Sequence, residues 1–293
     1  MSGDTSPVPH PRRAVLFVPG DKPRAIEKAA GLGADVLILD LEDAVAPEAK
    51  DSARAAAADA MAAWREAGAE RVIRMNGTEA GEFAADAAAV AEARPDAVVL
   101  PKVESPAGLK RAHARLAASG YYGPLWAMIE TPLALIDLRR IGETARDVRL
   151  EALVAGTNDL CAMLRCRCDG ERSALLPHLA GIVAAARAFA LVALDGVFND
   201  FSDPDGLRRE AEEGRRLGFD GKTLIHPAQV EIARTAFSPS ADELAEARKV
   251  VAAFDDPANA GRGAVSVDGR MVERLHLDAA RAALAAADQG EDD

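Results

Sequence analysis

Residues 125–132 read LWAMIETP, a short apolar run that ends in the carboxylate of Glu130. Thr131 is suited to cap a following helix, because its hydroxyl can accept a backbone N–H, and proline is favoured at the first helical position, where Pro132 stands. The stretch therefore predicts a buried strand that places Glu130 at its C-terminal end and is followed at once by a helix.

Residues 151–159, EALVAGTND, repeat this pattern. The apolar run is followed by polar residues that include Asp159 and lead into an apolar helix start. If the two strands are parallel neighbours, Glu130 and Asp159 lie at the same end of the sheet and could share a divalent cation. Mg2+ suits such a pair, because it binds one or two carboxylates and keeps positions open for substrate, and Mn2+ is the alternative.

Composition limits the class of protein. With 293 residues, of which 49% are hydrophobic, the chain can bury a large core in one large domain or two small ones. The formal net charge of -12 argues against binding to nucleic acid or to a membrane surface, because either partner requires a concentrated basic face. Residues 1–12 contain no apolar signal segment, and no run has the length of a membrane span, so we expect a cytoplasmic protein.

Apolar runs recur along the chain with helix-like sequence between them. Eight strands are predicted, at residues 14–18, 35–39, 71–75, 97–100, 125–129, 151–155, 191–194 and 222–225. Continuous rather than alternating apolar runs indicate parallel strands covered on both faces, and about 250 residues is the usual size of a TIM (β/α)8 barrel. We favour this α/β barrel over a doubly wound open sheet, because residues 19–23 read PGDKP where the open sheet would carry a G-x-G-x-x-G turn.

The chain ends differ from the barrel. Residues 1–12 are polar and contain prolines, which predicts a disordered N-terminal tail before a catalytic barrel at 13–254. Ser240 and Glu243 form a capping-box pattern for one more helix near the end of the barrel.

Residues 255–293 form a separate C-terminal segment. A stretch rich in Gly, Ala, Asp and Pro precedes a small hairpin at 265–270 and a last helix from Leu277. We interpret this segment as a helical lid extension, with a frayed acidic tail at 289–293.

Three cysteines, Cys161, Cys166 and Cys168, lie close together. No second cysteine pair or well-spaced histidine completes a zinc site, and an odd number does not suit a disulfide framework. We expect reduced thiols, in agreement with a cytosolic protein.

Polar residues follow nearly every predicted strand. They are Lys22, Asp40, Glu42, Asp43, Arg74, Asn76, Lys102, Glu104, Glu130, Asp159, Asp195 and His226. Because the active site of a TIM barrel lies at the C-terminal ends of its strands, these side chains are expected to meet. Structural interpretations remain for several: Asp43 could brace a loop, Ser105 could cap a helix, and His226 could begin one.

Lys102 has two interpretations. It could form a Schiff base, as in class I aldolases, but an ion pair with Glu104 or Asp43 is the favoured reading. Unpaired acids at strand ends are costly to bury, so Glu130 and Asp159 require compensation by a cation or by Arg74.

Seven segments stand in the order of a known family. They are LFVPG at 16–20, LDLEDAV at 39–45, VIRMN at 72–76, LPKVE at 100–104, IETP at 129–132, GTNDL at 156–160, and GFDGK at 218–222 through IHPAQ at 225–229. In these segments the chain resembles the citrate lyase β subunit-like family, the CoA-ester lyases of the HpcH/HpaI aldolase superfamily, over nearly its whole length.

The resemblance implies a TIM barrel that assembles as a homotrimer or hexamer and holds Mg2+ at Glu130 and Asp159. It also implies that Arg74 contacts the substrate together with Glu130. Phe17, Lys22 and Lys28 are expected along the path of a CoA thioester. Glu42, Asp43, Lys102 and His226 are expected to support the site.

The implied reaction is cleavage of a malyl-CoA or citramalyl-CoA type substrate to a 2-oxo acid and an acyl-CoA. Negative charge then develops on the thioester oxygen, where a cation and Arg74 can stabilise it. Three alternatives are a citrate lyase β subunit that acts on an acyl-carrier-protein thioester, a malyl-CoA thioesterase, and a non-catalytic CoA-ester-binding protein.

One segment departs from the family pattern. Related malyl-CoA and citramalyl-CoA enzymes carry Met-Ile-Asp in the lid, whose aspartate reaches a neighbouring subunit's site, whereas residues 271–273 here read MVE. Glu273 keeps the charge on an arm longer by one methylene, which displaces a proton-transfer group by about 1 Å. We expect Glu273 to be the catalytic acid or base.

Overall fold

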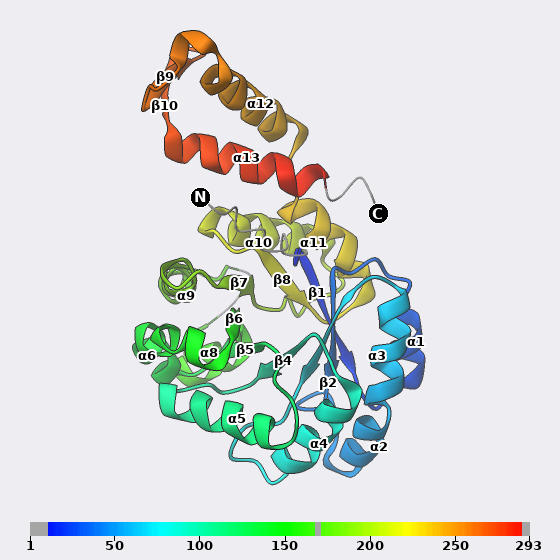
Figure 1. Cartoon of the computed structure of the whole chain (residues 1–293). Helices are drawn as coiled ribbons and strands as arrows, with labels where there is room; N and C mark the ends of the chain where they lie inside the picture. Colours follow the sequence, from blue (N-terminus) through cyan, green and yellow to red (C-terminus); the bar gives the residue numbers. More distant parts are fainter. Residues whose placement is uncertain (1–10, 168–170, 289–293) are drawn as a thin grey trace. The chain divides into compact units, whose positions relative to one another are not determined.

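The computed structural model describes residues 11–167 and 171–288. Eight parallel strands pair in chain order, and β1 pairs with β8, so the sheet closes into a barrel (Figure 1). The strands are β1 (Ala14–Pro19), β2 (Val36–Asp40), β3 (Glu70–Arg74), β4 (Ala97–Leu100), β5 (Leu125–Ile129), β6 (Leu150–Ala155), β7 (Val192–Asp195) and β8 (Gly221–Leu224). The predicted TIM barrel is confirmed, and the doubly wound sheet is excluded.

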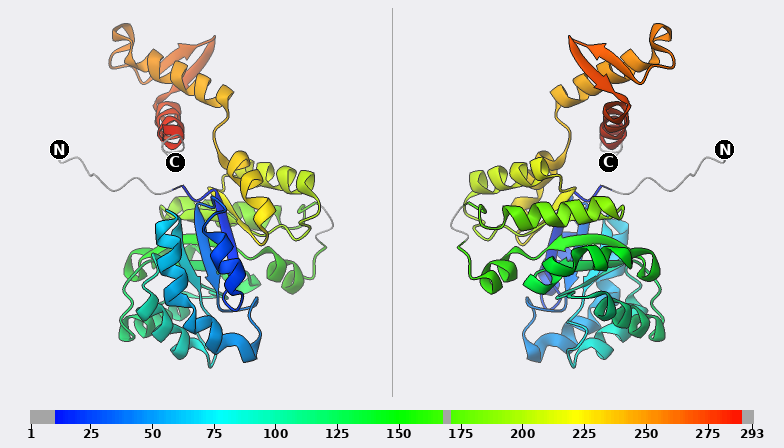
Figure 2. Two further views of the ribbon diagram at one scale, coloured as in Figure 1. Left: turned by 90° about the vertical axis from the view of Figure 1, so that its right-hand side faces the viewer. Right: turned by 90° about the vertical axis from the view of Figure 1, so that its left-hand side faces the viewer.

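Helices lie outside the strands, as the two side views of Figure 2 show. They are α1 (Pro23–Ala29), α2 (Lys50–Ala55), α3 (Ala57–Glu66), α4 (Phe83–Ala93), α5 (Pro106–Ala118), α6 (Pro132–Glu143), α7 (Ala145–Val148), α8 (Thr157–Leu164), α9 (Leu176–Ala188), α10 (Pro204–Leu217) and α11 (Val230–Phe237), with short 3-10 turns at Pro47–Ala49 and Pro227–Gln229. Within the described ranges, no helix is both long and apolar enough to cross a membrane.

The core has two layers. Inside the barrel, alternate strand residues such as Val36, Ile38 and Trp126 pack together, and their neighbours Leu37 and Leu39 pack outward against the helices. All five are fully buried, which explains why the strands read as continuous apolar runs. Each such side chain contributes about 1.5–3 kcal/mol by its burial.

Arg12 closes the N-terminal end of the barrel. Its guanidinium lies 4.7 Å from the centroid of the Trp126 ring, and it pairs with Glu70 at 2.6 Å and with Glu151 at 3.2 Å. Arg12 was placed in the predicted disordered tail, but its cation–π contact and ion pairs hold it against the strands. Residues 1–10 of that tail lie outside the described residues.

The cysteines differ from the expectation of reduced thiols. Cys161 is disulfide-bonded, so that expectation is wrong for this residue, while Cys166 is free. Cys168 lies outside the described residues.

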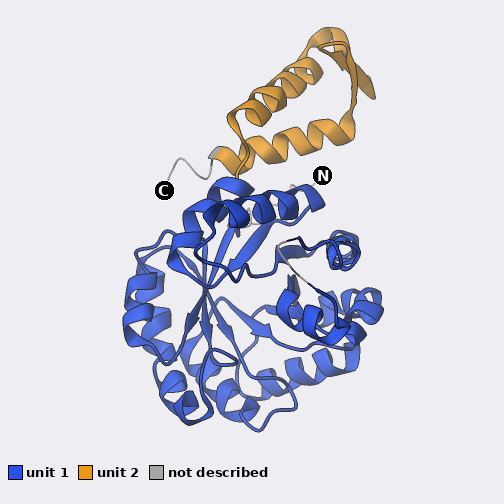
Figure 3. Ribbon diagram, turned by 180° about the vertical axis from the view of Figure 1, so that it is seen from behind, with its two compact units in different colours: residues 1–237 blue, residues 238–293 orange. Residues whose placement is uncertain are grey.

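The chain divides into two compact units, residues 1–237 and 238–293 (Figure 3). The second unit contains α12 (Ala241–Asp255), a 3-10 turn at Pro257–Asn259, the antiparallel hairpin of β9 (Ala264–Val267) and β10 (Arg270–Glu273), and α13 (Arg274–Asp288).

The division falls before α12, whereas the sequence predicts it at 254/255. The predicted capping box is present, since Ser240 Oγ accepts the backbone N–H of Glu243, whose side chain accepts that of Ser240. The helix nevertheless belongs with the hairpin and α13, because Val250 packs in one apolar cluster with Leu277. The predicted tail at 289–293 lies outside the described residues.

Candidate active site

Glu130 directly follows β5 and is 1% exposed. Thr131 caps α6 as predicted, because its hydroxyl accepts the backbone N–H of Ala134 at 3.2 Å. One carboxylate oxygen of Glu130, Oε1, accepts the backbone N–H of Lys102 at 2.6 Å. The other, Oε2, lies against Gly156, where an added Cβ would approach it to 2.6 Å. Gly156 thus leaves the space that the Glu130 side chain occupies.

Asp159 stands in the first turn of α8 and is half-buried. No hydrogen bond or ion pair to its carboxylate is found among residues 11–167 and 171–288.

Burial, reinforced by the negative charges of Glu42 and Asp159, raises the pKa of Glu130 to about 7, although the N–H of Lys102 opposes this rise. The two strand-end acids therefore lie close enough to repel each other.

Arg74 ends β3 and is held by Asp40, which ends the neighbouring strand β2. Its Nε and Nη2 donate to the two oxygens of Asp40 at 2.8 and 2.5 Å, and its guanidinium lies 4.7 Å from the centroid of the Phe17 ring. Burial by itself lowers the pKa of Arg74, but the hydrogen bonds and charge of Asp40, with the charge of Glu42, raise it above its ordinary value. Arg74 is therefore a fixed cation, and its Nη1 does not contact Asp40.

Glu42 links Arg74 to Lys102. Its Oε2 lies 3.0 Å from Arg74 Nη1, and its Oε1 accepts from Lys102 Nζ at 2.8 Å. Burial raises the pKa of Glu42, although both cations oppose this. Burial by itself lowers the pKa of Lys102, but the hydrogen bond and the charge of Glu42 raise it above its ordinary value. A protonated, paired amine is a poor nucleophile, so the geometry favours the ion-pair interpretation of Lys102. Its partner is Glu42 and not the expected Glu104 or Asp43.

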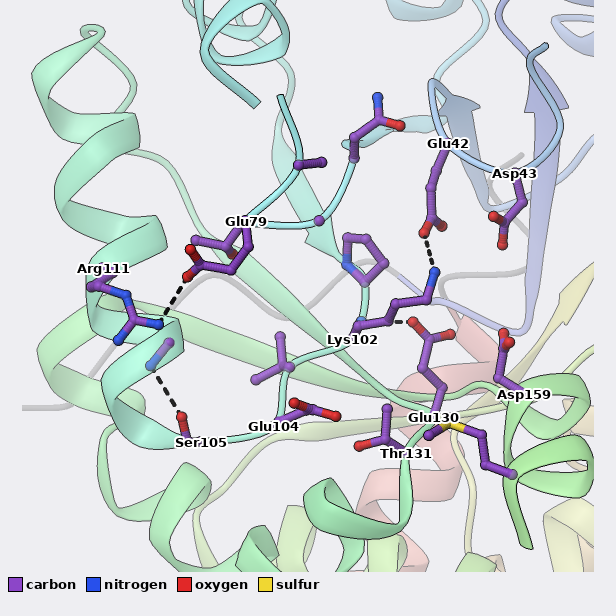
Figure 4. Close-up of a pocket in the computed structure, with 18 of the residues that line it drawn as sticks. Glu42, Asp43, Glu79, Lys102, Glu104, Ser105, Arg111, Glu130, Thr131 and Asp159 are labelled. Atoms are coloured by element: carbon purple, nitrogen blue, oxygen red, sulfur yellow. Dashed lines mark hydrogen bonds and ion pairs between the residues drawn. The ribbon is translucent and has the colours of Figure 1, made fainter. Parts of the chain in front are cut away.

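Two cavities meet at the acids. The larger, of about 740 Å³, extends over the ends of β3 and β4 to Glu79 and Arg111, and the smaller, of about 380 Å³, contains Phe17 and Arg74. Three residues line both, namely Asp43, Glu130 and Asp159. Figure 4 shows the larger cavity, with Lys102 pointing toward Glu42.

The remaining predicted residues lie elsewhere. Lys22 is exposed and pairs with Asp21 at 2.6 Å, and Lys28 is exposed on α1; neither lines either cavity. His226 caps the 3-10 turn after β8, as its structural interpretation predicted, because its Nδ1 accepts the backbone N–H of Ala228. Glu273 ends β10 in the second unit.

Three contributors were not assigned from the sequence. Asp40 was noted as a strand-end acid, but its pairing with Arg74 was missed; the β2–β3 register, which sets these two residues opposite each other, would have indicated it. Lys50 Nζ donates to the backbone oxygens of Leu41 and Glu42 and so fixes the Glu42 loop. Gly156 carries no local signal for its role.

The donor set fits a hard cation. Within the described residues no group of three or more acids, histidines or cysteines could form a complete metal site. Glu130 and Asp159 offer two carboxylates beside a cavity with room for water and substrate oxygens. This is the incomplete oxygen set that Mg2+ accepts in enzymes, because the ion retains several waters.

Comparisons with known proteins agree with this architecture. Residues 13–227 match the model of the HpcH/HpaI aldolase/citrate lyase family. The chain is 45% identical over 279 residues to a (3S)-malyl-CoA thioesterase of Cereibacter sphaeroides, with 95% of each chain covered. It is 32% identical to the mitochondrial citramalyl-CoA lyase of Homo sapiens, over 90% of this chain and 82% of that protein.

Solved structures of related proteins are similar to this chain in fold and in sequence. The protein CitE of Mycobacterium tuberculosis, in complex with magnesium, acetoacetate and coenzyme A, superposes with a TM-score of 0.75 at 35% identity, over 94% of this chain and 97% of that chain. A citrate lyase beta subunit from the same organism, complexed with oxaloacetate and magnesium, gives a TM-score of 0.67 at 34% identity, over 78% and 98% of the two chains.

Proposed function

Because the chain belongs to the HpcH/HpaI aldolase/citrate lyase family, we propose that it hydrolyses a malyl-CoA type thioester with the help of Mg2+ bound by Glu130 and Asp159. The observation that carries the proposal is the junction of the two cavities, where a pair of acids faces a fixed arginine. The 45% identity to (3S)-malyl-CoA thioesterases over 95% of both chains favours hydrolysis over the carbon–carbon cleavage expected from the sequence.

Glu130 and Asp159 would hold the cation, which would act as a Lewis acid toward the oxygens of the bound malyl group. Arg74 donates from Nη1, whose other N–H faces Glu42, to the thioester oxygen, where negative charge develops as water adds to the carbonyl carbon. Asp40 holds the guanidinium of Arg74 in place, and the Phe17 ring excludes water from one face of that guanidinium.

Hydrolysis also requires one proton to move from the attacking water to the departing thiolate. We assign this transfer to Glu273 of a neighbouring copy in a homotrimer or hexamer, as the family resemblance implies. Sedimentation of the purified protein tests the assembly, and cell fractionation tests the expected cytoplasmic location.

Carbon–carbon cleavage is the second candidate, favoured by the 32% identity to citramalyl-CoA lyase. The same Arg74 would stabilise the enolate oxygen of the departing acyl-CoA, and the proton would come from the substrate hydroxyl. The two reactions therefore share one site and differ in whether water or the substrate hydroxyl loses the proton.

A single assay separates them. Malyl-CoA is incubated with the protein and Mg2+, and free thiol and glyoxylate are measured in parallel samples. Hydrolysis releases thiol without glyoxylate, whereas cleavage releases glyoxylate and leaves the thioester intact in acetyl-CoA. Neither product from malyl-CoA or citramalyl-CoA would favour a binding protein, and activity restricted to an acyl-carrier-protein thioester would favour a citrate lyase subunit.

A further inference from the structure

Phe201 is held out of the core. It lies between β7 and α10, is 61% exposed, and stacks on His226 with 5.0 Å between ring centroids and 15° between ring planes. Burying a phenylalanine side chain stabilises a fold, and this position forgoes much of that stabilisation.

The exposed ring does not belong to a loose loop. Gln229, which is 2% exposed, joins the two segments, because its Oε1 accepts the backbone N–H groups of Ile225 and His226 and its Nε2 donates to the backbone oxygen of Phe198. The segment that carries Phe201 and the segment that carries His226 are therefore tied together on either side of the stack.

Local turns fix both rings further. Ser202 donates from its backbone N–H to Asp200, and Asp203 caps α10 by accepting the backbone N–H of Gly206 at 2.8 Å. The His226 ring accepts the backbone N–H of Ala228 at 3.2 Å. The stacked pair is thus a preformed flat aromatic surface.

The surface is adjacent in sequence to a residue that lines the smaller cavity. Ile225 lines that cavity and immediately precedes His226, while β8 pairs with β1, which contains Phe17 and is followed by Lys22. At about 380 Å³ the cavity matches the lower part of the range of about 300–1,000 Å³ that encloses drug-sized ligands. Coenzyme A is larger than such ligands, so its nucleotide end must lie outside, against the surface around the mouth.

We infer that Phe201, backed by His226, is the surface on which the adenine of the CoA thioester stacks. The inference rests on the proposed function. A purine presents a flat π face of similar size to the two rings, and stacking of a base on an aromatic side chain favours binding.

Binding of coenzyme A and of pantetheine, which lacks the nucleotide, tests the inference without turnover. Isothermal titration calorimetry should show that Phe201→Ala weakens coenzyme A binding about tenfold or more and leaves pantetheine binding unchanged. Phe201→Trp should retain the wild-type affinity, whereas Phe201→Leu, which is apolar but has no ring, should behave like Phe201→Ala.

Turnover gives a second measurement. With malyl-CoA, Phe201→Ala should raise KM about tenfold and leave kcat unchanged, and with malyl-pantetheine neither constant should change. Tyr122→Ala is the control, since Tyr122 is 66% exposed before β5, at the opposite end of the barrel.

Three results would overturn the inference: equal affinity of wild type and Phe201→Ala for coenzyme A, an equal loss for coenzyme A and pantetheine, or an altered sedimentation coefficient that marks Phe201 as a subunit contact. If wild type binds coenzyme A but turns over neither thioester, the proposed function fails while the stacking inference is still decided by calorimetry.

Discussion

The backbone N–H of Lys102 donates to Oε1 of Glu130 over 2.6 Å, and Lys102 adopts a left-handed φ of 51°. This conformation costs a residue with a Cβ about 1–2 kcal/mol, and such strain is typical of sites where a backbone group must point in one direction. The contact fixes one oxygen of Glu130 and leaves the other beside Gly156 for a ligand.

Two substitutions of Lys102 separate its backbone from its ammonium group. Lys102→Gly and Lys102→Val both remove the contact to Glu42, but glycine adopts a positive φ freely and a β-branched residue does not. We expect Lys102→Val to bind Mn2+ about tenfold more weakly than Lys102→Gly, because the valine moves the N–H away from Glu130. Electron paramagnetic resonance of free Mn2+ measures this.

Arg94 supplies the matched control, since it is exposed and has a φ of 50° at the end of α4. Arg94→Val should lose stability relative to Arg94→Gly and bind Mn2+ as wild type does. Equal Mn2+ affinity of the two Lys102 variants would show that the N–H does not orient Glu130.

Metal binding should depend on pH through Glu130, whose pKa is raised to about 7. A proton and the cation compete for the same carboxylate, so Mg2+ affinity should fall about tenfold between pH 8 and pH 6. For the metal-free protein, this raised pKa means that the contribution of Glu130 to stability is fully present below about pH 4.5 and is lost as the pH rises through 7.

Glu130→Gln tests both consequences. Calorimetric titration should find little Mg2+ binding at either pH, and in the presence of a chelator the variant should melt at a higher temperature than wild type at pH 8, because no buried charge remains. Glu104→Gln, in the larger cavity, should keep the wild-type pH dependence. A wild-type affinity that is constant from pH 6 to pH 8 would exclude Glu130 as the titrating ligand.

The barrel could be predicted because parallel strands buried on both faces leave continuous apolar runs. The organisation of the C-terminal segment could be predicted less well. Its last helix begins at Arg274 rather than Leu277, and α12 belongs to the second unit because Val250 packs with Leu277. A capping box marks where a helix begins, but not which distant helix it contacts.

The acids of the site could be predicted for the same reason: strand ends of a barrel converge. The arrangement around them depends on contacts far apart in sequence. No local pattern indicates that Lys102 has a positive φ, or that a Cβ on Gly156 would collide with Glu130. The paired hydrogen bonds between Asp40 and Arg74 can be predicted only from the register of β2 and β3, which is known only once the barrel is closed.

Arg74→Lys should lower kcat/KM for malyl-CoA about 10²-fold or more, the usual effect of losing a donor to a developing oxyanion. Arg74 uses two nitrogens on Asp40 and has a third, Nη1, that pairs with Glu42 and still has a second N–H for the substrate, whereas lysine has a single nitrogen for all of these contacts. Steady-state kinetics with circular dichroism as a check on folding measures this. Arg111→Lys, in the exposed pair with Glu79, is the control. A loss of less than threefold for Arg74→Lys would place the arginine outside the reaction.

Glu273 is the residue at which the chain departs from its family's lid pattern, and its surroundings bear on its role. An alternative to catalysis is a surface ion pair with Arg270 or Arg274. In the described part of the second unit, Arg270 instead pairs with Glu246 at 3.6 Å, and Arg274 donates to the backbone oxygen of Arg262. The Glu273 backbone N–H donates to His276 Nδ1, which fixes the end of β10.

We therefore predict that Glu273 transfers the proton in either candidate reaction. Glu273→Gln should lower kcat about 10²-fold with little change in KM, the usual size of a general acid–base contribution, and one limb of the pH–rate profile should disappear. Glu273→Asp should stay active, because it keeps the titrating group and restores the family's arm length. Glu246→Gln, which breaks an exposed pair in the same unit, should change neither constant. If Glu273→Gln keeps the wild-type kcat and only its melting temperature shifts slightly, Glu273 is a surface residue, since exposed ion pairs contribute at most about 1 kcal/mol to stability and nothing to proton transfer.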